Sequence, residues 1–413
     1  MRFALLFAAV SFCGIAAQAQ QVTVSVSNPT DFQRQELVEV DAKAVRQKLG
    51  IADGQPFKVI NALRQEVAYQ LTYDGKLLLD ASVRPKGVAR FTVVPGQPRP
   101  MKTVVCGRQY PERVDDIAWE NDRGAYRLYG PALQRNQERA FGNDVWVKNT
   151  PDLVVEQRYK LELSNHAAVE ALRKAGNTAA ADSLEELTTY HFDHGYGLDC
   201  YKVGPSLGCG APALMDGNQI VFPYCYTQYE ILDNGPLRFT VSLTYETKEF
   251  RGDRVTEHRL LSLDKGSNFN RQTVWYEGAT KPIDMASGVV IHNEDTASVY
   301  MQRNFVVYAD PTDNPAGQNF QIYVGVIFPE ESEREQLQEL YRLISQLGEL
   351  ERALILLWLD DVTANCWTMS GRNVYSRRTV TSSGNVPTAA TSSSARRLPM
   401  YVPYATTRRP ISR

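Results

Sequence analysis

The stretch from Leu237 to Phe250, LRFTVSLTYETKEF, decides the fold class of this chain. Between Arg238 and Tyr245, each apolar side chain is followed by a polar or charged one. Such alternation is typical of a β-strand that buries one face and exposes the other. Comparable segments on both sides of this stretch predict an all-β chain.

Strand-like segments of this kind recur along residues 101–330. Turn signals such as Asn234-Gly235 separate them, and no βαβ pattern intervenes. The segments therefore predict one large antiparallel β-sandwich, a supersandwich, over residues 101–330. A helical hairpin broken at Gly176-Asn177 is the expected insertion, at residues 166–191. The expected strands are LVVEQRYKLEL (153–163), QIVFPYCYTQYEIL (219–232), VTEHRLLSL (255–263), NRQTVWYEG (270–278), SGVVIHN (287–293) and FQIYVGVIF (320–328).

Residues 20–100 alternate in shorter runs, among them VTVSVSN, FKVINA and KLLLDASV. Turn signals at Asn28-Pro29, Asp53-Gly54 and Asp74-Gly75 separate these runs. The pattern predicts a small N-terminal β-sandwich domain, with a short helix ending near Leu49.

The first residues read MRFALLFAAVSFCGIAAQA, with one arginine, a short apolar run and small residues at Ala17 and Ala19. This combination predicts a signal peptide over residues 1–19, cleaved near Ala19. The apolar run is too short to cross a bilayer, and no later segment is long and apolar enough. We therefore expect a periplasmic or secreted protein without membrane insertion.

The end of the chain differs in composition from the rest. Residues 331–361 place Leu and Ile near heptad spacing, which predicts a helical segment. Residues 362–413 hold eight arginines but no Asp, Glu or Lys, and this tail is expected to be disordered or translated out of frame. Because the net charge of the whole chain is −2, the remainder is acidic, which argues against nucleic acid as a partner.

Acidic and aromatic residues are unusually dense in two segments, residues 106–146 and 190–204. Carboxylates and imidazoles beside flat rings suit a protein that holds sugars and moves protons on them. The expected partner is therefore a polysaccharide or an oligosaccharide. The residues expected to bind it are Asp116, Trp119, Arg127, Tyr129, Trp146, Tyr196 and Lys202.

One interpretation of these segments is β-elimination on an acidic, uronate-containing glycan. In it, Arg127 neutralises the sugar carboxylate, His191 or His194 removes the C5 proton, and Tyr201 or Tyr196 protonates the leaving oxygen. General acid–base assistance of this kind contributes on the order of 10²–10⁴-fold to a rate.

A second interpretation is hydrolysis by paired carboxylates, for instance Glu120 with Asp199, whose separation would set the stereochemical outcome. A non-catalytic glycan-binding or accessory role is the alternative to both. No cofactor or metal is expected; a divalent cation such as calcium is compatible with the Asp and His residues, but H-x-D-H fits no standard site. The isolated histidines His166, His258 and His292 are expected to have no functional role.

Strand parity sorts the candidate residues by face. Asp116 and Glu120 share a parity that is opposite to that of Trp119. If residues 191–201 are extended, His191, Asp199 and Tyr201 share one face, whereas His194 and Tyr196 share the other. Gly195 and Gly197 lie between them, where a bulge could reverse one side chain.

The segments PERVDDIAWENDRGAYRLYGPAL, NDVWVK, YHFDHGYGLDCYKVGPSLGCGA, NGPLRF and LDKGSN resemble a domain family of unknown function that is common in Bacteroidetes. The similarity runs from about Val24 to Glu330. It implies a secreted protein from gene clusters that degrade complex polysaccharides, and a β-sandwich related to the galactose-mutarotase-like supersandwich. It implies no particular catalytic residues, because the family has no agreed set.

Overall fold

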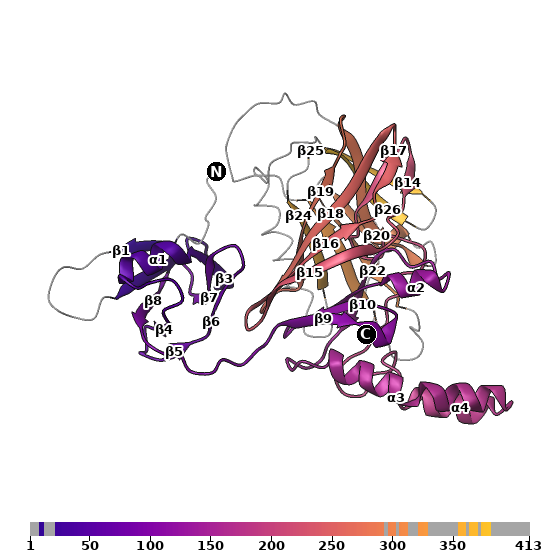
Figure 1. Ribbon diagram of the computed structural model, residues 1–413, viewed down its shortest axis with the longest axis horizontal. Helices are drawn as coiled ribbons and strands as arrows, with labels where there is room; N and C mark the ends of the chain where they lie inside the picture. The colour runs from indigo at the N-terminus through magenta and orange to yellow at the C-terminus, as the bar shows by residue number, and fades with distance from the viewer. Residues whose placement is uncertain are drawn as a thin grey trace, which may run out of the picture. The chain divides into compact units, whose positions relative to one another are not determined.

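The computed structural model describes residues 8–11, 21–292, 296–302, 305–312, 321–328, 354–360, 363–370 and 373–380. Strands dominate these ranges and pair mostly antiparallel (Figure 1). The expected all-β class is therefore confirmed. No helix in the described ranges is long and apolar enough to cross a membrane.

The N-terminal part is built from two small sheets. One has the order β1-β2-β8-β4-β5 and the other the order β3-β7-β6, and apolar side chains from both form one core with helix α1. Strand β1 lies inside the segment expected to be cleaved, and the cleavage stays a prediction. The bounds are β1 Ala8–Ser11, β2 Val22–Ser27, β3 Arg34–Asp41, α1 Ala42–Leu49, β4 Phe57–Asn61, β5 Glu66–Val67, β6 Tyr69–Leu71, β7 Lys76–Val83 and β8 Val88–Pro95.

The largest sheet has the order β15-β16-β18-β19-β24-β23-β22-β21, with β17 paired to β18. In β16 the inward positions Phe239, Val241 and Leu243 are buried, as the alternation predicted. The bounds are β15 Tyr226–Asn234, β16 Arg238–Tyr245, β17 Lys248–Phe250, β18 Asp253–Asp264, β19 Phe269–Glu277, β21 Val299–Gln302, β22 Phe305–Asp310, β23 Ile322–Ile327 and β24 Leu354–Asp360.

Two further sheets complete the described fold. One has the order β14-β13-β20-β26-β25 and shares a hydrophobic core with the largest sheet. The other has the order β12-β11-β10-β9 and carries most of the first acidic and aromatic segment. The bounds are β13 Ala213–Asp216, β14 Gln219–Val221, β20 Ile283–Val290, β25 Thr363–Ser370, β26 Asn373–Val380, β9 Cys106–Tyr110, β10 Asp116–Glu120, β11 Gly124–Leu128 and β12 Asn143–Val147.

The helical insertion is longer than the sequence predicted. Helix α3 spans Val155–Lys174 and α4 spans Thr178–Glu186, with the break at Gly176-Asn177 confirmed. The expected strand at residues 153–163 was wrong, because its apolar residues are spaced for a helix as well as for a strand. Val155 and Tyr159, one helical turn apart, are both buried against the β9–β12 sheet.

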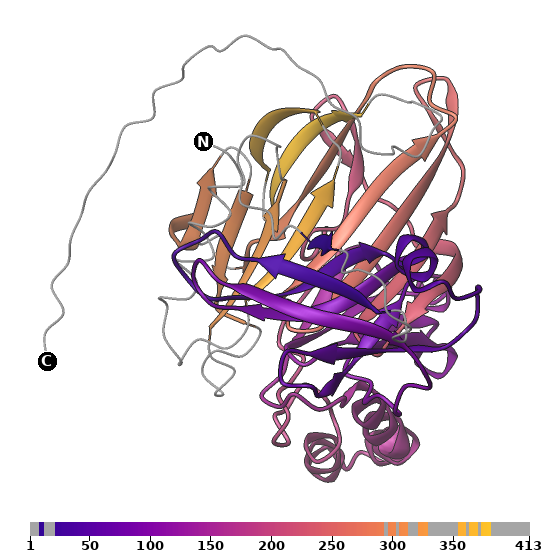
Figure 2. The ribbon, with the colours of Figure 1, turned by 90° about the vertical axis from the view of Figure 1, so that its left-hand side faces the viewer.

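The structure also corrects the expected end of the fold. Residues 354–360 form β24 instead of the end of a helix, and β25 and β26 lie in the segment expected to be disordered (Figure 2). The run LILLWLD lies between β19 and β23 and pairs in parallel with both, so it satisfies backbone hydrogen-bonding groups on the edges of these two strands. A short apolar run cannot be assigned to helix or strand by periodicity alone. Residues 329–353 and 381–413 lie outside the described residues.

Candidate functional site

The β9–β12 sheet separates apolar from polar side chains. On one face, Ile117, Trp119 and Tyr126 join the large hydrophobic core. On the other face, Asp116, Arg127 and Asp144 lie beneath α3 and the segment that follows α4. The predicted opposition of Asp116 and Trp119 is therefore confirmed.

Arg127 is the centre of the polar face. Its Nη2 pairs with Oδ2 of Asp144 on the neighbouring strand and, at 2.8 Å, with Oδ2 of Asp199. The side chains of Arg127, Asp144 and Asp199 are 5%, 0% and 2% exposed, so the ion triad is closed to solvent. Asp199 belongs to the second dense segment, which shows that the two segments fold together as the sequence indicated.

Burial gives the carboxylates of this face unusual proton affinities. Burial raises the pKa of Asp116 to about 6, although Arg127 and Arg113 oppose the shift. The pKa of Asp144 is raised by burial too, against the opposing charge of Arg127. Both groups therefore exchange protons nearer to neutral pH than an exposed aspartate does.

The Tyr190 hydroxyl lies between two guanidinium groups. It accepts a hydrogen bond from Nη1 of Arg127 at 3.2 Å, and from Nε and Nη2 of Arg113 at 3.2 and 3.0 Å. Tyr190 also stacks on Trp146, with ring centroids 4.7 Å apart. Tyr190 thus links the closed triad to Arg113, which is only partly buried. Among the residues that the structure describes, no carboxylate lies within ion-pair distance of Arg113, although the charge of the buried Asp116 acts on it.

Arg113 is held by a tight turn between β9 and β10. Val114 and Asp115, directly after it, adopt positive φ of 47° and 64°. This backbone conformation is unfavourable for a β-branched valine, so the surrounding structure must enforce it. The Asp115 side chain accepts a hydrogen bond from the amide of Ala132, and Gly130 packs so closely that an added Cβ would lie 2.0 Å from the Asp115 carbonyl oxygen.

His191 lies on the solvent side of the same group. Its ring is tilted on Tyr190, with centroids 4.7 Å apart, and its side chain is 48% exposed. Its Nδ1 lies 3.0 Å from the backbone carbonyl oxygen of Asp199 and 3.8 Å from Oδ2 of the same residue. A carbonyl oxygen can only accept, so Nδ1 carries the proton in the neutral ring and Nε2 is left as an unprotonated acceptor.

Residues 191–201 do not form the extended segment that strand parity assumed. Gly195 and Gly197 have positive φ of 99° and 86°, and both amides donate to Oδ1 of Asp193. The backbone therefore turns, as short loops with glycine and aspartate do. His194 points back to its own loop, where Nε2 lies 2.9 Å from the carbonyl oxygen of Thr189.

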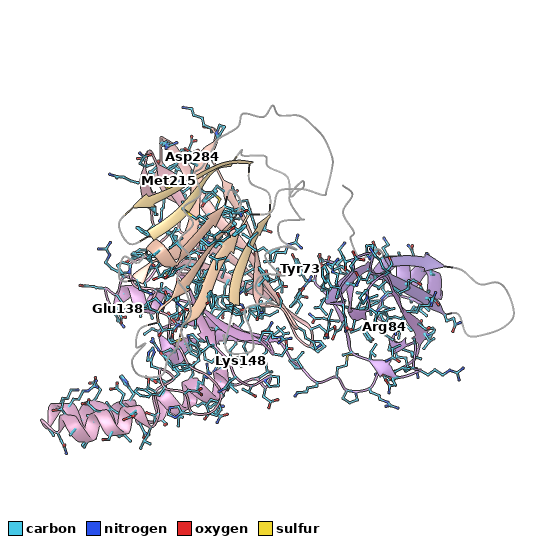
Figure 3. The ribbon with its side chains drawn as sticks, turned by 180° about the vertical axis from the view of Figure 1, so that it is seen from behind. Tyr73, Arg84, Glu138, Lys148, Met215 and Asp284 are labelled. Carbon is cyan, nitrogen blue, oxygen red and sulfur yellow. The ribbon has the colours of Figure 1, made fainter. Side chains whose placement is uncertain are left out.

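Glu120 lies on the polar face but has a different set of partners. Its Oε1 accepts from the amides of Val154 and Val155, at 2.7 Å each, and its Oε2 pairs at 2.6 Å with Nζ of Lys148, which is labelled in Figure 3. A carboxylate at the start of a helix satisfies free amides and the positive end of the helix dipole. Glu120 therefore anchors α3, and the structure shows no contact between it and Asp199.

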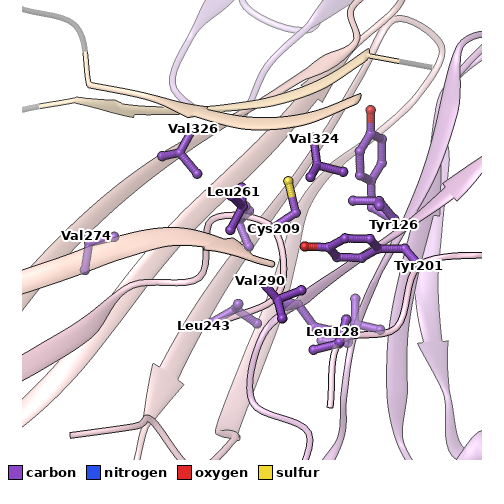
Figure 4. Close-up of a cluster of buried hydrophobic side chains, with 14 of the residues drawn as sticks. Tyr126, Leu128, Tyr201, Cys209, Leu243, Leu261, Val274, Val290, Val324 and Val326 are labelled. Carbon is purple, nitrogen blue, oxygen red and sulfur yellow. The ribbon is translucent and has the colours of Figure 1, made fainter. Parts of the chain in front are cut away.

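Trp119 and Tyr201 are buried in the large core. Trp119 stacks on Phe239 and donates from Nε1 to Asn270 at 2.7 Å. The Tyr201 ring lies beside Leu128 and Val290 (Figure 4), and the residue is 3% exposed. Neither side chain shares the polar face with His191.

The remaining predicted binding residues are spread over the site and its border. Trp146 donates from Nε1 to Asp144 at 3.2 Å, and the Tyr129 ring lies under the Arg127 guanidinium, 5.0 Å from it. Tyr196 is only partly buried, with its hydroxyl 3.4 Å from Gln157. Lys202 is exposed at the far end of the loop.

Sequence reasoning did not select Arg113, Tyr190 or the carbonyl of Asp199 as parts of the site. Tyr190 was available from its position at the head of the second dense segment, but the turn that places Arg113 has no recognisable sequence signal. In the described ranges, no group of three His, Cys, Asp or Glu side chains is arranged to hold a metal ion.

A family model described as Domain of unknown function (DUF4861) matches residues 26–351. A curated relative from Formosa agariphila, described as Uncharacterized protein P7, is 27% identical over 243 residues, which is 56% of this chain and 55% of the relative. The chain thus spans about half the length of the curated relative that it matches.

Two solved structures from Enterococcus faecalis resemble the chain distantly. One, a protein in Glycosyl Hydrolase Family 38, is 9% identical with a TM-score of 0.35. The match covers 71% of this chain and 39% of the Glycosyl Hydrolase Family 38 chain. The other, an alpha-mannosidase, is 10% identical with a TM-score of 0.32. The match covers 88% of this chain and 43% of the alpha-mannosidase chain. Likeness at this level says nothing about what the chain acts on.

Proposed function

We propose that this chain, which belongs to the DUF4861 family, is an enzyme that cleaves uronate-containing polysaccharides by β-elimination. The predicted signal peptide at residues 1–19 supports an activity outside the cytoplasm. Arg113 binds the sugar carboxylate, and His191 carries the proton. Tyr190 and Asp199 hold these two side chains in place.

One observation carries this proposal: the exposed His191 imidazole and the Arg113 guanidinium, which forms no ion pair within the described residues, both contact Tyr190. The Asp199 carbonyl fixes Nδ1 of His191 as a donor and leaves Nε2 as the base. The Tyr190 hydroxyl holds Arg113, and its ring contacts His191. The cation and the base therefore adjoin the same tyrosine.

The reaction balances without a cofactor. When Arg113 pairs with the uronate carboxylate, it stabilises the negative charge that builds up as the C5 proton leaves. Nε2 of His191 takes that proton, the C5–H electron pair forms the C4–C5 double bond, and the bond from C4 to the bridging oxygen breaks. The His191 imidazolium, whose Nδ1 lies 3.8 Å from Oδ2 of Asp199, then returns its proton from Nε2 to that oxygen.

These assignments differ from those expected from the sequence. Arg127 already neutralises two buried carboxylates, so it is a poor receptor for a third. Tyr201 is a poor acid for a polymeric substrate because it is 3% exposed. Hydrolysis by Glu120 and Asp199 is disfavoured because each carboxylate is buried and paired with its own cation.

A glycan-binding protein without turnover is the second candidate. Phe192, next to His191, is 44% exposed, although phenylalanine is usually buried. An exposed ring can stack on the apolar face of a sugar, and binding of this kind needs no base.

The test is to incubate the protein with a panel of uronic-acid polysaccharides and to follow the ultraviolet absorbance of the unsaturated uronate product. We expect absorbance to rise with at least one polymer, and His191→Gln to lower the rate on the order of 10²–10⁴-fold. His166→Gln, on the exposed surface of α3, is the matched control and should keep full activity. New reducing ends without absorbance would instead indicate hydrolysis, and retention on a polymer without either signal would indicate a binder.

A further inference from the structure

The isolated histidine His292, two residues after the end of β20, has both ring nitrogens occupied by acceptors. Its Nδ1 lies 2.6 Å from Oδ2 of Asp310, and its Nε2 lies 2.7 Å from the backbone carbonyl oxygen of Lys202. The His292 side chain is 18% exposed and that of Asp310 is fully buried.

These contacts determine the charge of the ring. A neutral imidazole has one N–H and can satisfy only one acceptor, whereas the imidazolium donates to both. Burial alone would lower the pKa of His292, but the hydrogen bond and charge of Asp310 outweigh it, so the pKa lies above the usual histidine value. The ring is thus a cation shared between a buried carboxylate and a loop carbonyl.

The groups around the ring belong to β22 and to residues 199–203. From β22, Asp310 faces Nδ1 and the Tyr308 hydroxyl bonds to the His292 backbone. From residues 199–203, the Tyr201 ring lies edge-on with centroids 5.8 Å apart, and the Lys202 ammonium disfavours the cation by its charge. The Asp310 carboxylate offsets this unfavourable charge of Lys202.

We propose that His292 is a positioning residue, which as an imidazolium holds the segment Asp199–Val203 in the place that His191 requires. This rests on the proposed function, because the Asp199 carbonyl at the other end of the segment fixes the His191 tautomer. His292 fixes the chain at Lys202, and Tyr201, next to that residue, lies buried between the two points. Loss of the proton from His292 removes one of its two hydrogen bonds and loosens the segment.

The first test needs no substrate. Nitrogen-detected NMR of the histidine rings at neutral pH should show His292 with protons on both nitrogens, and His191 with a proton on Nδ1 alone. Asp310→Asn should lower the pKa of His292 by about one pH unit or more, because the paired charge is lost. In that variant the His191 ring signals should shift when His292 loses its proton. A neutral His292 ring in the wild type would overturn the proposal.

The second test uses the rate of elimination against pH. Asp310→Asn should move the alkaline limb of the profile to lower pH by about one unit or more, and His292→Gln should remove that limb. The matched control is Glu277→Gln, which alters the solvent-exposed pair between His258 and Glu277 and should leave the profile unchanged.

If Asp310→Asn lowers stability but leaves both the His191 signals and the pH profile unchanged, His292 is merely structural and the proposal fails. If the wild type eliminates no uronate polymer, the proposed function fails, and the NMR response of His191 still decides whether His292 positions it.

Discussion

Replacing Arg127 by methionine tests whether the buried triad organises the site. Methionine fills much of the arginine volume but has no charge, so Asp144 and Asp199 would remain buried without a cation. Removing one partner of a buried ion pair typically costs about 3–5 kcal/mol. The exposures of the three side chains, 5%, 0% and 2%, put this triad in that class. We expect the free energy of unfolding at pH 8 to fall by about 3–5 kcal/mol.

The loss should depend on pH in a defined direction. Without Arg127, the pKa of Asp144 rises further, because burial and the charge of Asp199 then act on it without the opposing guanidinium. At pH 5 the folded variant can then take up protons that the unfolded chain holds less tightly. Proton uptake by the folded state stabilises it as pH falls. The stability difference between wild type and Arg127→Met should therefore be smaller at pH 5 than at pH 8.

Urea unfolding at the two pH values measures this difference. Arg173→Met is the matched control, because Arg173 also bridges two carboxylates, Asp182 and Glu185, but is 46% exposed. The Arg173→Met variant should lose about 1 kcal/mol or less of its free energy of unfolding at either pH. Equal losses for the two variants, or a larger loss for Arg127→Met at pH 5, would refute the assignment of a closed ion triad.

The remaining predictions concern the same face of the β9–β12 sheet. Because burial raises the folded-state pKa of Asp116 and Asp144 from 3.8 to about 6, unfolding free energy should fall as pH rises through this interval and level off above it. Asp144→Asn should flatten that slope in urea titrations, and an unchanged slope would contradict the pKa assignment. Glu120→Ala should cost about 3–5 kcal/mol and speed hydrogen exchange in the first turn of α3; normal protection there would show that Glu120 is not its anchor. His194→Ala should lower stability by about 1 kcal/mol, the loss of its bond to Thr189, and should leave elimination intact, in contrast to His191→Gln.

The alternation along β16 and β18 was sufficient to predict the sandwich, because one face of each strand is buried. The same reasoning placed Asp116 and Glu120 opposite Trp119, since β10 is a regular strand. The alternation failed to predict residues 153–163 and 354–360, where tertiary contacts determine whether the segment forms a helix or a strand. Glu120 caps the first of these segments, and the edges of β19 and β23 pair with the second.

The sequence predicted which types of residue make up the candidate site, but not the role of each residue. The density of acids and rings identified both segments, and Arg127 does join them through Asp199. Parity could not assign the second segment, because glycines at positive φ reverse the chain there. Arg113 could not be predicted as a site residue for a related reason, because a strained turn at Val114 positions it and no sequence motif marks that turn.

The central claim is that His191 and Arg113 catalyse elimination, and the fate of solvent oxygen tests it most directly. Wild-type protein should act on a uronate polymer in heavy-oxygen water, and the new chain ends should be analysed by mass spectrometry. Elimination breaks the chain without adding water, so we predict an unsaturated end and no heavy oxygen in either fragment. Saturated ends that carry one heavy oxygen for each broken linkage would contradict the mechanism.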